Sequence, residues 1–146
     1  MISGRDFLTL AELWVKGTSE AEWRSAISRA YYAAFHAARQ FMEDLGFVVP
    51  RGERAHAYLW LRLSNCGDHQ LQIAGSRLNV LRSQRNRSDY ELSINVHQAS
   101  GLVQVQVAAE IVQIIEGTNQ APTRAQVTDT IKDYERNILK VVTWRP

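Results

Sequence analysis

The stretch from Leu71 to Leu92 constrains the fold of this chain more than any other part of the sequence. It contains two series of residues spaced seven apart. The first series is Leu71, Leu78, Arg85 and Leu92, and the second is Ala74, Leu81, Ser88 and Asn95. Because seven residues are close to two turns of an α-helix, all eight positions fall on one stripe. The first half of this stripe is apolar, so the pattern predicts a helix that packs into a core.

Arg85 and Ser88 continue the same stripe with polar side chains. A helix that buries Leu71, Leu78 and Leu81 is expected to bury the next positions too. Removing an unpaired guanidinium from water is expensive. We therefore expect Arg85 to have an ion-pair partner, a ligand or a water-filled cleft.

Apolar residues spaced three and four apart predict further helices at residues 3–16, 19–45, 53–65, 98–117 and 122–142. Ser19 with Glu22 three residues later forms a capping-box pattern, and Gly46 is the expected end of the same helix. Asp68 is the expected N-cap of the helix that carries the central stretch. Residues 47–52 are expected to form a loop.

One segment, Val103 to Val107, alternates like a β-strand. A single strand would have no partner among helices, so we predict that it is helical. The predicted fold is all-α, an antiparallel up-and-down bundle of five or six helices that forms one domain over residues 1–146.

The predicted last helix, residues 122–142, is amphipathic. Its apolar stripe consists of Val127, Ile131, Tyr134, Ile138 and Val141. Such a helix can fold back on its own bundle or pack on a second chain, and the sequence leaves both arrangements open.

Composition says little about partners, because the net charge of the 146 residues is only +2. The arginines are nevertheless clustered, since Arg77, Arg82, Arg85 and Arg87 fall within eleven residues. Cys66 is the only cysteine, which predicts no internal disulfide and a cytoplasmic location. No signal peptide or membrane span is expected, so no membrane partner is predicted.

No metal or cofactor site is predicted. The four histidines, His36, His56, His69 and His97, form no H-x-x-x-H pair, and no phosphate-binding glycine loop is present. His56, near the start of its helix, is expected to be exposed. Cys66 is expected to be an inert thiol rather than a nucleophile.

The polar run that follows the apolar stripe carries the most chemistry. On a helix Arg82, Arg85, Asn86 and Asp89 share one face, and Arg85 can pair with Asp89 at i,i+4. Two arginines beside an amide suit a phosphate, because a guanidinium donates in a fork to its oxygens. The alternative is that Asp89 neutralises an arginine and the remaining groups are solvated surface.

A second segment, Tyr31 to His36, is aromatic. One interpretation places these side chains in the core, with the tyrosine hydroxyls at its rim. The other has Tyr32 or His36 face the same cleft as Arg85.

The two segments together resemble the HEPN domain superfamily. Ser28 to Arg39, SRAYYAAFHAAR, is similar to the long second helix of its small prokaryotic single-domain members, and Arg85 to Tyr90, RNRSDY, is similar to a run on a later helix. The resemblance implies an all-α bundle that commonly forms homodimers through the arginine-bearing helices. Many such proteins are metal-independent endoribonucleases of toxin–antitoxin or defence systems, often found beside a minimal nucleotidyltransferase partner.

By this resemblance Arg85 is the arginine of the R-x(4 to 6)-H nuclease motif and Asn86 its usual polar follower, while Tyr90 stands where the motif has histidine. Arg85, Asn86 and Tyr90 are then the catalytic candidates, with Arg82, Asp89, Tyr32 and His36 as supporting residues. A tyrosine hydroxyl ordinarily has a pKa of about 10, which makes it a poor base at neutral pH. Three functions stay open: an RNA-cleaving or RNA-binding protein, a non-catalytic module for a nucleotide or partner protein, and a purely structural bundle.

Overall fold

The computed structural model describes residues 1–146, and its regular structure is entirely helical. The six α-helices are α1 (Gly4–Val15), α2 (Glu20–Asp44), α3 (Arg54–Ser64), α4 (His69–Tyr90), α5 (Gln98–Thr118) and α6 (Thr123–Tyr134). The predicted all-α helical bundle is confirmed, including a helix through the alternating valines of α5. No helix is both long and apolar enough to cross a membrane.

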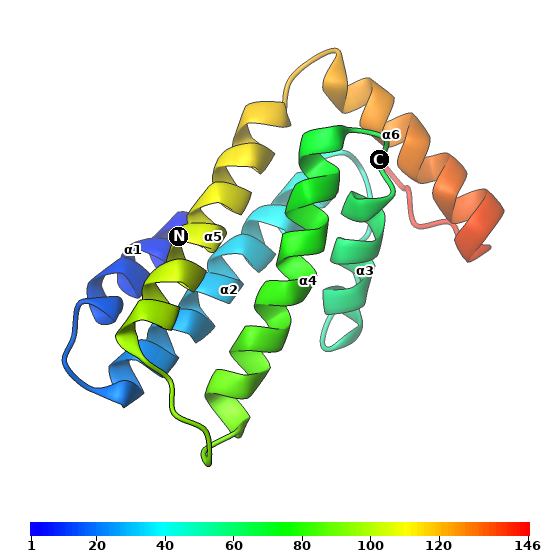
Figure 1. Ribbon diagram of the computed structural model, residues 1–146. Coiled ribbons are helices and arrows are strands. Elements are labelled where there is room, and N and C mark those ends of the chain that lie inside the picture. The colour runs from blue at the N-terminus through cyan, green and yellow to red at the C-terminus, as the bar shows by residue number, and fades with distance from the viewer.

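The helix α4 packs on α2, α3 and α5, and α2 in turn packs on α1, α3, α4 and α5 (Figure 1). It runs antiparallel to α2, so the C-terminal half of α4 lies beside the N-terminal half of α2 (Figure 1). Close packing is possible because small residues line the contacts. A Cβ added to Gly75 of α4 would lie 2.7 Å from the backbone nitrogen of Ser64, which shows how closely α3 approaches.

Local sequence signals set the helix ends as predicted. Ser19 Oγ accepts a hydrogen bond from the Glu22 N–H at 3.2 Å, and Glu22 Oε1 accepts one from the Ser19 N–H at 3.3 Å. Asp68 Oδ2 accepts from the Leu71 N–H at 3.0 Å and so caps α4. Gly46, with a φ of +103°, follows α2 in a left-handed conformation that glycine adopts without steric cost.

The central stripe is buried over most of its length. Leu71, Leu78 and Leu81 are at most 1% exposed, and Ser88 is 4% exposed. The prediction fails at Leu92, which is 79% exposed. The reason is that α4 ends at Tyr90, so Leu92 lies in the following turn and no longer follows the helical repeat.

The predicted last helix, residues 122–142, is too long. The α-helix ends at Tyr134, a π-helical turn covers Glu135–Leu139, and Lys140 adopts a φ of 59° where the chain turns back. Ile138 and Val141 are therefore exposed rather than part of an apolar stripe. The returning segment forms a single β-bridge between Trp144 and Phe47, and the indole Nε1 of Trp144 donates to the Leu45 carbonyl at 2.9 Å.

A buried ion pair holds this returning segment to the bundle. The Arg62 Nε donates to Glu135 Oε2 at 2.8 Å, and the two side chains are 4% and 1% exposed. Glu135 also accepts from the Thr143 N–H at 2.9 Å. Val127 and Ile131 join the same hydrophobic core as the other helices, so α6 packs on its own chain.

We predict that Glu135→Ala lowers the free energy of unfolding by about 3–5 kcal/mol, because it leaves the Arg62 guanidinium buried without its counter-charge. Urea denaturation followed by circular dichroism measures the change. The control is Asp133→Ala, which removes an exposed pair with Arg136 at 3.8 Å and should change stability by less than about 1 kcal/mol. Equal effects of the two substitutions would show that the buried pair does not stabilise the fold.

Candidate functional site

The antiparallel packing of α2 and α4 brings together the two segments that the sequence analysis singled out. A buried arginine of α2, Arg24, fixes where α4 ends. Its guanidinium donates to the Ser88 carbonyl at 2.9 Å, to the Glu91 carbonyl at 3.2 Å and to the Ile94 carbonyl. These are carbonyls that a helix end and the following turn leave without intrahelical partners, and a cation is also favoured at a helix C-terminus. No motif in the sequence marks Arg24, so this role could not be predicted.

One helical turn further along α2, Ser28 contacts the polar face of α4. The Ser28 Oγ donates to Asp89 Oδ2 at 3.2 Å. The same carboxylate oxygen lies 2.9 Å from Arg85 Nε, so the ion pair expected at i,i+4 is present. Asp89 therefore links the two helices as well as balancing one charge.

The guanidinium of Arg85 lies between aromatic rings. Its central carbon is 5.2 Å from the ring centroid of Tyr32 and 5.6 Å from that of Tyr90, distances at which a cation is attracted to an aromatic face. Its Nη1 also donates to Asn86 Oδ1 at 3.0 Å. The Arg85 side chain is only 12% exposed, so its guanidinium is held in place at the rim of the core.

The environment of Arg85 keeps it charged. Burial disfavours the charged form, but Tyr32, Asp89 and Tyr90 outweigh that effect, and the pKa of the guanidinium is raised. The carboxylate of Asp89, 2.9 Å from Arg85 Nε, is the partner of that atom, whereas Arg82 Nε is a buried donor without an acceptor. Such donors are rare in native structures and mark places where a further acceptor would be stabilising.

Arg82 has only a weak partner within the chain. Its Nη2 lies 3.4 Å from Glu53 Oε2, and the Glu53 side chain is 82% exposed. Exposed pairs of this kind contribute little to stability and exchange readily with solvent. Arg82 is thus a second cation, one helical turn from Arg85, that is free to meet an anion.

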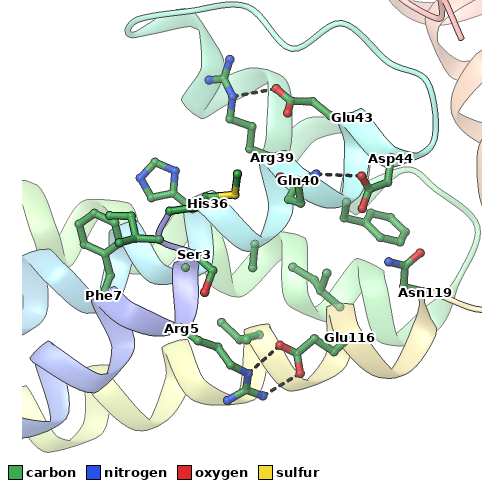
Figure 2. A pocket seen from close by; sticks show the side chains of 17 residues that line it. Ser3, Arg5, Phe7, His36, Arg39, Gln40, Glu43, Asp44, Glu116 and Asn119 are labelled. Carbon is green, nitrogen blue, oxygen red and sulfur yellow. Dashed lines mark hydrogen bonds and ion pairs between the residues drawn. The ribbon is translucent and has the colours of Figure 1, made fainter.

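We call the cluster of Arg82, Arg85, Asn86, Asp89 and Tyr90 on α4, with Tyr32 of α2, the arginine site. His36 is not part of it. The imidazole of His36 stacks on the ring of Phe7 from α1, with centroids 5.1 Å apart. His36 instead borders a cavity of about 580 Å³, which lies between the start of α1, the second half of α2 and the end of α5 (Figure 2).

None of the residues of the arginine site lines this cavity. The cavity is lined by apolar side chains such as Phe41 and by polar ones, and each of its two arginines is paired with a glutamate. Figure 2 marks the pairs of Arg5 with Glu116 and of Arg39 with Glu43, whose atoms are 2.7 Å and 2.9 Å apart. Arg82, Arg85, Asn86, Asp89 and Tyr90 all lie outside it. Neither arginine side chain of the cavity is therefore free for a phosphate.

The prediction that His56 is exposed is wrong. His56 is 5% exposed, because the first turn of α3 faces α2 rather than solvent, and its Nδ1 shares a hydrogen bond with the Tyr31 hydroxyl. Burial lowers the pKa of His56, and the charges of Arg82 and Arg85 lower it further while Glu53 acts in the opposite direction. His56 is therefore a neutral core residue beneath the arginine site.

The remaining candidates for metal or nucleophilic chemistry are not assembled into a site. Cys66 is 1% exposed, and burial raises the pKa of its thiol, which favours the unreactive protonated form. No three side chains among the histidines, cysteines and acids are grouped so that they could hold a metal ion. The arginine site is thus the only cluster of the predicted residues that the fold assembles.

We predict that the protein loses stability as the pH falls below about 6.5, the ordinary histidine value. The pKa values of His56 and His36 are lowered in the folded state, mainly by burial, so the unfolded chain binds more protons in this range and acid favours unfolding. Urea denaturation between about pH 5 and pH 8 measures the slope. His56→Gln should flatten it, whereas the matched control His97→Gln, at an exposed position, should not. An identical slope in wild type and His56→Gln would contradict this account.

Comparisons with known proteins assign no family to this chain. No protein-family model, curated protein or solved structure matches it. The function is therefore argued from the geometry of the arginine site.

Proposed function

We propose that this chain is an RNA-acting protein of the HEPN type, with the arginine site of α4 as its phosphate-binding centre. The observation that carries the proposal is Arg85, whose guanidinium is held at the rim of the core by Asp89, Tyr32 and Tyr90, with the weakly paired Arg82 one helical turn away. A held guanidinium at the edge of the core loses little entropy when it binds. Arginine is also the side chain best suited to phosphate, because its fork matches two oxygens.

RNA supplies the chemistry that these groups complement. A phosphodiester offers charged oxygens to Arg85 and Arg82, and the nucleobases offer flat faces to aromatic side chains. Tyr90, 71% exposed and next to Arg85, provides such a face. The proposal thus rests on two cations and one exposed ring within a few residues of α4.

Cleavage in this proposal needs no metal. Solvent accepts the proton of a ribose 2′-OH, the oxygen attacks the adjacent phosphorus, and the bond to the 5′-oxygen breaks as that oxygen takes a proton. In this proposal Arg85 stabilises the charge that builds on the phosphate, and the Tyr90 hydroxyl donates the proton to the leaving oxygen. The site thus contains an arginine that can stabilise negative charge, but no side chain well suited to act as the base.

That imbalance favours a second candidate function, a non-catalytic module that binds a nucleotide or a partner protein such as a minimal nucleotidyltransferase. The specific observation is that Tyr90 occupies the histidine position of the motif, and the nearby His56 is buried against Tyr31. Binding then uses the same residues without a proton acceptor. In both forms a role in a toxin–antitoxin or defence system is part of the proposal.

A homodimer formed through α4 is also part of the proposal. Val80 on α4 is 60% exposed, and Leu92 in the turn after α4 is 79% exposed. Apolar groups at these positions gain from burial against a second copy. Packing α4 against its symmetry mate would place two arginine sites side by side.

We predict that the wild-type protein binds RNA and that any cleavage persists in EDTA. Arg85→Gln should weaken binding at least about tenfold, since a charged hydrogen bond and a phosphate contact are both lost. Tyr90→Phe should leave binding within about twofold, because the ring is kept, and should slow cleavage. Filter binding and gel analysis of labelled RNA measure the two effects. Activity that EDTA abolishes and magnesium restores would contradict the mechanism, and binding without cleavage would select the second candidate function.

We predict that the protein is a dimer at micromolar concentration, with a mass twice the 16.6 kDa of one chain. Sedimentation equilibrium measures the mass. Val80→Glu should shift the equilibrium toward monomer, because it places a charge in the apolar contact. The control Val48→Glu, at an exposed position outside α4, should leave the mass unchanged. A monomeric wild type would rule out a shared site.

A further inference from the structure

A third arginine of the site comes from α2 rather than α4. We propose that Arg29 and Arg85 together hold the phosphodiester backbone of a single-stranded RNA across the ring of Tyr32, while an unpaired base stacks on Tyr90. The inference rests on the proposed function, because it assigns the substrate class and an additional binding residue to the same site.

The position of Arg29 is set by two aromatic rings. Its guanidinium carbon is 5.2 Å from the ring centroid of Tyr32 and 5.6 Å from that of Phe7. Arg85 approaches the same Tyr32 ring, also at 5.2 Å. The single ring of Tyr32 therefore has a guanidinium from α2 and another from α4 as neighbours.

Both guanidiniums are connected to one carboxylate, Arg85 directly and Arg29 only through Ser28. Arg29 Nη2 donates to Ser28 Oγ at 3.3 Å, Ser28 Oγ donates to Asp89 Oδ2 at 3.2 Å, and Asp89 Oδ2 is the ion-pair partner of Arg85. Arg29 forms no ion pair of its own, and its only hydrogen bond is the one to Ser28. One negative charge thus faces two fixed positive charges.

This excess charge favours an anion. Two guanidiniums near one ring repel each other, and a phosphate between them replaces the repulsion by two attractions. Arg29 is only partly buried, and most of its five N–H donors have no acceptor within the chain, so they remain free for phosphate oxygens. Arg29 also widens the site from one helix face to a surface that crosses from α4 to α2.

The exposed ring of Tyr90 selects among RNA forms. Arg85 covers part of this ring, and the side chain remains 71% exposed. A base can stack there only when it is not already paired and stacked within a duplex. A single strand satisfies both the cations and the ring, whereas a duplex satisfies the cations alone.

The competing explanation is purely structural: Arg29 covers the rings of Phe7 and Tyr32 and helps α1 to pack on α2. The two explanations differ in what a substitution changes. A structural role changes stability and leaves the salt dependence of RNA binding as in wild type. A phosphate contact changes affinity and reduces the number of counter-ions released on binding.

The test measures binding of the full chain to fluorescein-labelled single-stranded oligouridine at several salt concentrations. Arg29→Gln should weaken binding at least about tenfold and reduce the slope of log K against log salt by about 0.7, the value for one phosphate contact on a single strand. The control is Arg145→Gln, which removes an equal charge from an exposed residue without an ion pair, near Gly46. Its affinity should stay within about twofold of wild type.

Two further measurements separate the inference from the proposed function. Tyr90→Leu should weaken binding of the single strand but not that of an RNA duplex. If Arg85→Gln weakens binding while Arg29→Gln behaves like Arg145→Gln, the inference is wrong and the proposed function stands. If Arg85→Gln also binds like wild type, both fall.

Melting curves check that each variant is folded. Should Arg29→Gln not fold, Arg29→Lys decides the matter, because lysine keeps the charge but loses the planar fork. Weaker binding by Arg29→Lys supports the inference, and unchanged binding overturns it.

Discussion

The hydrogen bonds from Arg24 to the end of α4 are the constraint on which the candidate site depends. They fix the point at which the helix stops and therefore the register of α4 against α2. With that register set, Ser28 meets Asp89 at 3.2 Å and Tyr32 meets Arg85 at 5.2 Å. A shift of one residue along α4 would rotate Arg85 by about 100° and remove both contacts.

The protein uses buried arginines in two ways that differ in their balance of charge. The charge of Arg62 is balanced by Glu135, and this buried pair holds the returning C-terminal segment. Arg85 is 12% exposed, and its carboxylate partner, Asp89, also accepts a hydrogen bond from Ser28. A buried ion pair with balanced charges stabilises a fold, whereas a cation at the rim of the core whose donors are not all satisfied is available for a ligand.

Local patterns in the sequence were sufficient to predict most of the fold, because caps and apolar spacing act within a few residues. Ser19 and Asp68 begin helices and Gly46 ends one, as expected. The i,i+4 pairing of Arg85 with Asp89 is also present. What could not be predicted depends on contacts between distant segments. Polar residues such as Glu135, His56 and Arg24 are buried because a partner from another helix meets them, and spacing alone contains no information about that partner.

In the proposed function the anion binds where positive charge is uncompensated, and not in the cavity of about 580 Å³. In that cavity Arg5 and Arg39 are each paired with a glutamate. The net charge of +2 would not have singled out any site either. At the arginine site two guanidiniums lie near a single ring, and the acid that pairs with Arg82, Glu53, is exposed and weakly held. In the proposed function a polyanion would neutralise this local positive charge without breaking the contacts that hold the bundle together, so folding and binding would depend on different contacts of α2 and α4.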